Sequence, residues 1–90
     1  MSDFDGFISL FYDYLERRSL RITFYRRMVA RLCVSMDGEF TAEQIHSLAR
    51  SFENARPLTI ATVYRTLNEL VDAEVLTYES DFDGITYRVR

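Results

Sequence analysis

The residues best suited to chemistry are arginines, and most of them lie in one stretch of the chain. Positions 17 to 31 carry six arginines and no acidic residue, namely Arg17, Arg18, Arg21, Arg26, Arg27 and Arg31. The planar guanidinium group can donate two parallel hydrogen bonds to a phosphate. This stretch therefore predicts a surface that binds a polyanion, and Arg21, Arg26 and the neighbouring arginines are its candidate contacts.

A second group of candidate side chains follows the only proline of the chain. It consists of Thr59, Ala61, Thr62, Tyr64 and Arg65. Arg65 can donate to the O6 and N7 atoms of a guanine or to a phosphate, and the ring of Tyr64 can lie against a thymine methyl group. Thr59 and Thr62, at a predicted helix start, suit a phosphate. In the competing interpretation, Arg65 only pairs with Glu69 four residues later on the helix surface.

Catalytic and metal-binding chemistry is poorly supported. The chain has one cysteine, Cys33, and one histidine, His46, which are too few for a disulfide, a catalytic triad or a metal cluster. It also lacks a glycine-rich phosphate loop. We expect no enzyme activity, no metal and no cofactor, with Cys33 in the core and His46 partly exposed.

Length and composition indicate one globular domain over residues 1–90. Apolar residues make up 48% and charged residues 28% of the chain. The acidic start and the lack of a long apolar run predict a cytoplasmic protein without a membrane segment. The net charge of −3 counts against tight binding to nucleic acid, but this charge is unevenly distributed.

Four helices are predicted to position these side chains. Apolar residues at helical period indicate a first helix over Phe4–Arg18, a second from Thr23 to a stop at Gly38, a third starting at Thr41, and a fourth over Ile60–Ala73. Thr41 with Gln44 forms a predicted capping box. The buried face of the third helix is predicted to hold Ile45, Leu48, Ala49 and Phe52.

The first predicted helix has a strongly aromatic stripe, which consists of Phe4, Phe7, Ile8, Phe11, Tyr14 and Leu15. The simpler interpretation is a helix packed on the core. The alternative is a homodimer interface, with Tyr12 and Phe24 as additional exposed surface.

After the fourth helix, the sequence pattern changes from helical period to alternation. Val75–Glu79 and Ile85–Val89 are predicted strands, joined by the turn at 81–84. Four helices followed by a hairpin predict a winged helix-turn-helix, a mainly α fold with a two-stranded wing. The alternative is an α+β domain with no role in nucleic-acid binding.

Three runs of residues resemble a known family. They are Arg21-Ile22-Thr23 with Arg26, Phe40-Thr41-Ala42-Glu43-Gln44-Ile45, and Ile60-Ala61-Thr62-Val63-Tyr64-Arg65-Thr66-Leu67. In this order and spacing, the chain resembles the N-terminal DNA-binding domain of the ferric uptake regulator family, over roughly residues 15 to 90. The run Ala-Thr-Val-Tyr-Arg-Thr-Leu is the most specific part.

The resemblance implies a DNA-binding winged helix in which the matching Tyr64 and Arg65 contact DNA and Arg21 lies near the minor groove. It also shows departures from the family pattern. Glu39 stands where the family often has a histidine ligand, and the metal-sensing and dimerising C-terminal domain is not matched. Glu74 replaces a glycine after the fourth helix, which costs about 1 kcal/mol in a left-handed helix end.

Two functions follow as expectations. The first is a sequence-specific regulator of transcription that binds double-stranded DNA without a metal-sensing domain. The alternative is a protein-interaction module of the same fold, which modulates another regulator through its acidic wing instead of binding DNA.

Overall fold

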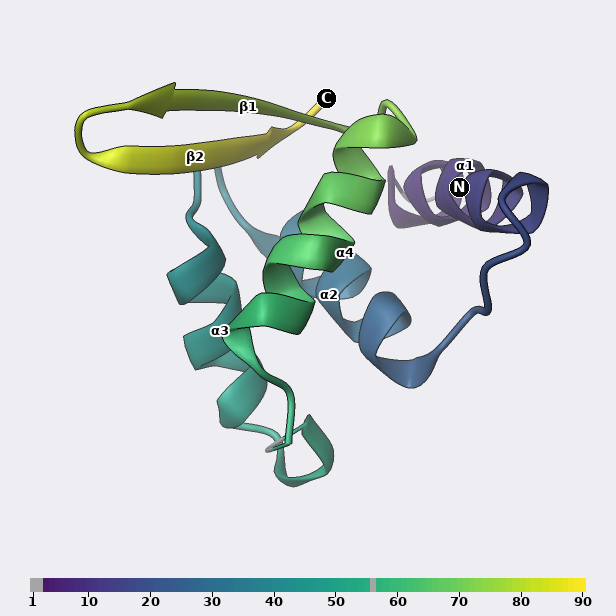
Figure 1. Cartoon of the computed structure of the whole chain (residues 1–90), viewed down its shortest axis with the longest axis horizontal. Helices are drawn as coiled ribbons and strands as arrows, with labels where there is room; N and C mark the ends of the chain where they lie inside the picture. The colour runs from purple at the N-terminus through teal and green to yellow at the C-terminus, as the bar shows by residue number, and fades with distance from the viewer. Residues whose placement is uncertain (1–2, 56) are drawn as a thin grey trace.

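The computed structural model describes residues 3–55 and 57–90 (Figure 1). The elements follow in the order α1 (Asp3–Arg17), α2 (Phe24–Ser35), α3 (Ala42–Arg50), the 3-10 turn η1 (Glu53–Ala55), α4 (Ile60–Asp72), β1 (Leu76–Asp81) and β2 (Gly84–Val89). Figure 1 shows α2, α3 and α4 grouped together, α1 at one end of the molecule, and the hairpin reaching toward the other end. Four helices followed by an antiparallel hairpin confirm the predicted winged helix-turn-helix.

Threonine caps start three of the helices, as the sequence predicts. Thr23 Oγ1 accepts from the amide of Arg26 at 3.2 Å, and Thr59 Oγ1 accepts from the amide of Thr62 at 3.2 Å. Thr41 and Gln44 form the complete capping box, with bonds of 3.1 and 2.8 Å. Each cap satisfies an amide that the first turn of a helix leaves unpaired.

Two helices end on a residue in the left-handed conformation that is not glycine. Ser19 after α1 has φ 56° and Glu74 after α4 has φ 64°. At the end of α4, the amide of Glu74 donates to the carbonyl of Val71 at 2.9 Å and that of Val75 donates to Leu70 at 3.1 Å. This pair of bonds is the Schellman motif, and it confirms the strained position expected for Glu74.

The predicted end of the second helix is wrong. α2 ends at Ser35, and the next residue, Met36, is already extended with φ −77° and ψ 142°. Gly38 does adopt a positive φ of 83°, but it does so in the loop that leads to α3. The glycine signal therefore marks a turn that lies beyond the helix end.

The aromatic stripe of α1 packs mainly on the core. Phe7, Phe11, Tyr14 and Leu15 are buried, and Cys33 of α2 joins the same cluster. This confirms the core interpretation for most of the stripe. Only Phe4 and Ile8 of the stripe are half-buried.

The predicted buried face of α3 is half wrong. Ile45 and Ala49 are fully buried, whereas Leu48 is 41% and Phe52 is 50% exposed. Leu48 lies about 60° around the helix from Ile45, on the side away from Ala49, because each residue turns the helix by about 100°. Phe52 follows the end of α3 at Arg50, so helical periodicity no longer determines where it points.

The wing is anchored to the helices at its base. β1 pairs with β2 from Leu76↔Val89 to Asp81↔Gly84, so both strands extend beyond their predicted bounds on the turn side. Phe40, just before α3, adds a bridge to Tyr87, with hydrogen bonds of 2.9 and 2.7 Å in opposite directions. No local pattern in the sequence predicts this bridge.

In the parts of the chain that the structure describes, no helix combines the length and apolar character that crossing a bilayer requires.

Candidate nucleic-acid interface

The N-terminal turns of α4 present the predicted residues on one outward side. Ala61 and Arg65 are exposed, as is the cap Thr59, while Thr62 and Tyr64 are half-buried. On the opposite side of α4, the buried residues are Val63, Thr66, Leu67 and Leu70. The structure thus brings five of the seven predicted site residues together, at a helix end where unpaired amides favour a negative ligand.

Hydroxyl groups connect the exposed residues of this first turn. Thr59 Oγ1 and Thr62 Oγ1 lie 3.0 Å apart, and the Arg65 guanidinium donates to Thr62 Oγ1 at 3.4 Å. Arg65 is therefore held along the helix by a long, weak contact that a stronger acceptor can replace.

Tyr64 is oriented by a residue of α3. Its hydroxyl donates to Glu43 Oε1 at 2.8 Å. This bond stabilises the charged carboxylate and so lowers the pKa of Glu43. It also raises the pKa of Tyr64, because the phenol must give up the donated proton in order to ionise. The Tyr64 hydroxyl therefore points toward α3.

Arg26 differs from the candidates on α4 because its guanidinium is already bound within the protein. Its guanidinium makes two bonds to Glu69 of α4, Nε to Oε1 at 2.9 Å and Nη2 to Oε2 at 2.8 Å. Its remaining nitrogen, Nη1, donates to the carbonyl of Arg21 at 2.8 Å. The two side chains of the pair are only 17% and 12% exposed, and the hydrogen bond to Glu69 raises the pKa of Arg26.

The competing interpretation, in which Arg65 pairs with Glu69, is wrong. Both carboxylate oxygens of Glu69 accept from Arg26. Arg65 is left exposed on the outer side of α4, where its described side-chain partner is Thr62. No local pattern in the sequence indicates a pair whose members are 43 positions apart.

Two more long-range contacts position α4, and neither could be predicted from local sequence patterns. The Tyr14 hydroxyl of α1 donates to Asp72 Oδ2 at 3.3 Å. At the other end, His46 Nε2 of α3 lies 2.9 Å from the carbonyl of Leu58, just before the Thr59 cap. His46 is half-buried, as expected, and it ties α3 to the turn that leads into α4.

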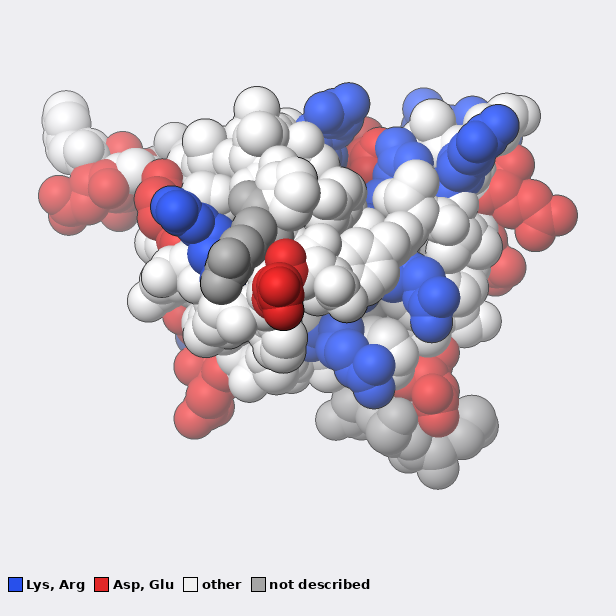
Figure 2. Space-filling view, turned by 90° about the horizontal axis from the view of Figure 1, so that it is seen from below, with Lys and Arg blue, Asp and Glu red and all other residues white. Residues whose placement is uncertain are grey.

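The arginine-rich stretch divides between surface and structural roles. Arg21, Arg27 and Arg31 are exposed, whereas Arg26 is not. Figure 2 shows arginines spread over the face seen from below, with an acidic side chain among them near its middle and other acidic side chains toward its edges. This arrangement agrees with an uneven charge distribution on a chain whose net charge is −3.

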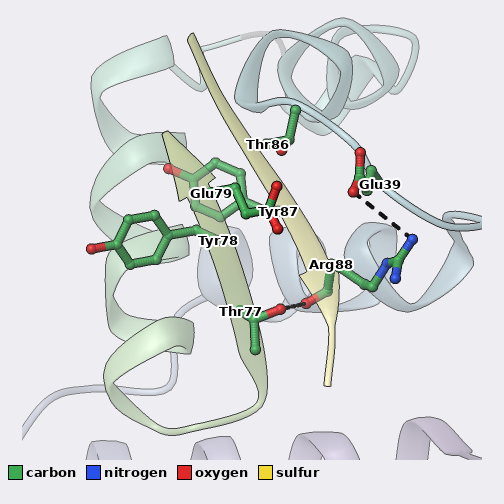
Figure 3. Close-up of a pocket in the computed structure, with 7 residues that line it drawn as sticks. All are labelled: Glu39, Thr77, Tyr78, Glu79, Thr86, Tyr87 and Arg88. Carbon is green, nitrogen blue, oxygen red and sulfur yellow. Dashed lines mark hydrogen bonds and ion pairs between the residues drawn. The ribbon is translucent and has the colours of Figure 1, made fainter. Parts of the chain in front are cut away.

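A small polar recess of about 80 Å³ lies on the wing beside Glu39, the position where the resembled family often has a metal ligand (Figure 3). The nearest charged partner of Glu39 is Arg88 of β2, whose Nη2 lies 3.9 Å from Oε1. A cation at this distance disfavours a bound metal ion. Among the described residues, no three His, Cys, Asp or Glu side chains form a group that could hold a metal.

The chain is similar to proteins of one known family. A family model described as the ferric uptake regulator family matches residues 17–89. Two curated proteins, each named ferric uptake regulation protein and found in Campylobacter upsaliensis and Campylobacter jejuni, are 31% identical to the chain over 75 residues. The alignment covers 83% of this chain and 48% of each relative, so the chain spans about half the length of the curated relatives it matches.

Solved structures show the same fold. The ferric uptake regulator Fur of Helicobacter pylori superposes with a TM-score of 0.86 at 17% identity, over 98% of this chain and 58% of that one. A manganese uptake regulator superposes with a TM-score of 0.72 at 23% identity, over 89% of this chain and 58% of that chain.

Proposed function

Because the chain belongs to the ferric uptake regulator family, we propose that it is a transcriptional regulator that binds double-stranded DNA through the N-terminal turns of α4. The observation that carries the proposal is the exposed side of these turns, where Arg65 extends from a helix that three other helices hold in place. A helix presented in this way fits the major groove.

Each exposed residue has a role in this proposal. Arg65 donates to a guanine edge or to a phosphate, exchanging its weak contact with Thr62 for a stronger acceptor. Thr59 and the amides of the first turn bind a phosphate. Ala61, Thr62 and the ring of Tyr64 pack against base edges, and Arg21 contacts the backbone beside the helix.

Arg26 takes a supporting role in the proposed interface. Its guanidinium is committed to Glu69 and to the Arg21 carbonyl, so it positions α4 and the loop that carries Arg21. Moving it to a phosphate would leave the half-buried Glu69 carboxylate without its partner, which is costly.

The acidic groups of the chain limit the affinity of one copy for DNA. Asp81 and Asp83 at the wing tip would be repelled by a phosphate backbone, and one small domain buries little surface on DNA. Tight binding therefore requires two copies on neighbouring half-sites. The half-buried aromatic side of α1, with Tyr12 and the neighbouring exposed Phe24 of α2, remains our proposed surface for such self-association.

Fluorescence anisotropy with labelled random-sequence duplexes of about two helical turns tests the proposal. The wild type should bind with an affinity that falls several-fold between about 50 and 200 mM salt, because phosphate contacts release counterions. Arg65→Ala should weaken binding about tenfold or more. The matched control Arg17→Ala removes one arginine from α1 and should have a much smaller effect.

The two parts of the proposal fail separately. Wild-type protein that shows no binding at low salt and tens of micromolar contradicts DNA binding, because non-specific dissociation constants are about 1–100 µM even at physiological salt. Binding that is equal for wild type and Arg65→Ala contradicts only the assignment of α4 as the helix that contacts DNA.

A second candidate function is a protein-interaction module that modulates another regulator. The wing favours it, because Glu79, Asp81 and Asp83 are all exposed on the hairpin. In this case the chain should leave DNA unbound and should release a family member from its operator when the two proteins are mixed. The same anisotropy assay measures this release.

A further inference from the structure

The tip of the wing carries an exposed aromatic side chain that the turn itself does not need. Phe82 has a relative exposure of 108% and lies between Asp81 and Asp83. The turn is closed by other groups: the Asp83 amide donates to Asp81 Oδ1 at 2.8 Å, and Gly84 supplies a φ of 118°. The ring of Phe82 therefore stabilises nothing in its own chain.

A DNA backbone does not account for this tip. Two carboxylates beside the ring would face phosphates of the same charge, with no cation of the tip between them. An apolar ring flanked by two acids instead fits an apolar recess flanked by two bases.

Such a recess exists between α1 and α2. It is a groove of about 430 Å³ whose apolar lining includes Ile8 and Tyr12 from α1 and Phe24 and Met28 from α2. Phe24 is 49% exposed, so an apolar partner would remove a large part of its ring from water. The groove is of the size that accepts an aromatic side chain.

Two exposed arginines line the same groove. Arg27 and Arg31 are one helical turn apart on α2, and the Arg31 Cζ lies 5.4 Å from the centroid of the Phe4 ring. Carboxylates that enter beside an apolar side chain would meet both guanidinium groups, each of which can donate two hydrogen bonds. The groove is therefore complementary to the wing tip in size, polarity and charge.

We propose that the wing tip of one copy of this chain, residues 81–83, docks into the α1–α2 groove of a second copy. Phe82 fills the apolar groove, and Asp81 and Asp83 pair with Arg27 and Arg31. The proposal goes beyond DNA binding and does not depend on it.

The location of the two surfaces determines the kind of assembly. Figure 1 shows the wing tip at one end of the molecule and α1 at the other end. A tip therefore reaches the groove of a neighbour, and this neighbour keeps its own tip free. Contacts between unlike surfaces of this kind build head-to-tail assemblies.

The contact is small, so association should be weak in free solution and stronger where copies are concentrated. Sedimentation velocity without DNA, from about 10 µM to 1 mM protein at low salt, measures it directly. The weight-average sedimentation coefficient of the wild type should rise with concentration. The rise should shrink at about 500 mM salt, because the charge pairs are screened.

Phe82→Ala should raise the dissociation constant about tenfold or more, as truncation of a central aromatic anchor does. Since Phe82 is fully exposed, this variant keeps the fold. The matched control is Leu10→Ala, which truncates another exposed apolar side chain, 55% exposed on α1 and outside the groove. The control should sediment as the wild type does.

Charge exchange gives a second test that does not rely on loss of binding alone. One variant carries Asp81→Arg and Asp83→Arg, and the other carries Arg27→Asp and Arg31→Asp. Each variant alone should stay monomeric, whereas an equimolar mixture should associate, because each tip then faces a groove of opposite charge. A wild type that stays monomeric to about 1 mM, or a mixture that does not associate, overturns the proposal.

Discussion

Arg26 of α2 and Glu69 of α4 are joined by two hydrogen bonds of 2.9 and 2.8 Å, across 43 positions of the sequence. Both partners are largely shielded from water, with exposed fractions of 17% and 12%. A bidentate interaction between a planar guanidinium and a planar carboxylate restricts both sliding and rotation of one helix against the other. The pair therefore fixes which side of α4 faces outward.

We expect Glu69→Ala to reduce the free energy of unfolding by about 1–3 kcal/mol, because it leaves the Arg26 guanidinium half-buried without its partner. The double variant Arg26→Ala with Glu69→Ala should lose less than the sum of the two single variants. Urea unfolding monitored by circular dichroism measures all three. Glu16→Ala, at an exposed acid of α1, serves as the control, and strictly additive losses would show that the pair is uncoupled.

The bond between Tyr64 and Glu43 should be visible in a titration. Donation from the Tyr64 hydroxyl lowers the pKa of Glu43 below its ordinary value of 4.5. The stability that the bond contributes is therefore complete above pH 4.5 and is lost as the pH falls through the lowered pKa of Glu43.

Nuclear magnetic resonance of the Glu43 side chain can follow this titration. In Tyr64→Phe, the pKa of Glu43 should move upward, toward the ordinary value. Tyr78→Phe removes an exposed phenol from the wing instead and should leave the Glu43 pKa where it is in the wild type. An unchanged Glu43 pKa in Tyr64→Phe would mean that the phenol points elsewhere in solution.

Glu74→Gly should stabilise the chain by about 0.5–1 kcal/mol. Glu74 has φ 64°, a conformation that glycine adopts without the steric cost that a Cβ brings. Thermal unfolding should show a melting temperature several degrees higher than that of the wild type. Glu16→Gly, at a helical position of α1, should do the opposite, so a loss of stability in both variants would contradict the left-handed end.

Much of this fold could be predicted from local sequence patterns. Helical period located all four helices. Thr41 and Thr59 marked the starts of α3 and α4, because capping depends on residues only three positions apart. The stop at Gly38 was wrong by a few residues, since a glycine with positive φ indicates a turn without saying which one. Leu48 was misplaced because a short helix buries only a narrow side.

The candidate site was less accessible to the same reasoning. Arg65 and Thr62 could be placed on the outer side of α4 from their spacing, and the structure puts them there. The partners that hold α4, Arg26 with Glu69 and Tyr14 with Asp72, are 43 and 58 positions apart and leave no local pattern. The sequence therefore predicted Arg26 as a surface contact and gave no sign of its bond to Glu69.

The thiol of Cys33 should be inert in the native protein. Burial raises the pKa of Cys33 far above its ordinary value, so almost no reactive thiolate forms at neutral pH. A thiol reagent such as dithiobis(nitrobenzoate) should react slowly with native protein and rapidly in urea, at a rate that reports local opening. Ser47→Cys adds an exposed thiol on α3 as the control and should react at once, and equally fast reaction of the wild type would contradict the burial of Cys33.

The bridge between Phe40 and Tyr87 has a consequence for how the wing moves. Phe40 directly precedes the Thr41 cap of α3, and its amide and carbonyl are both bonded to Tyr87 of β2. Lifting the base of the hairpin must break these two bonds and pull on the first turn of α3. In hydrogen exchange, the amides of Phe40 and Tyr87 would therefore lose protection together, at the rate at which the helices themselves open. The base of the wing belongs to the cooperative unit of the helices, and only the part near the turn can fluctuate independently.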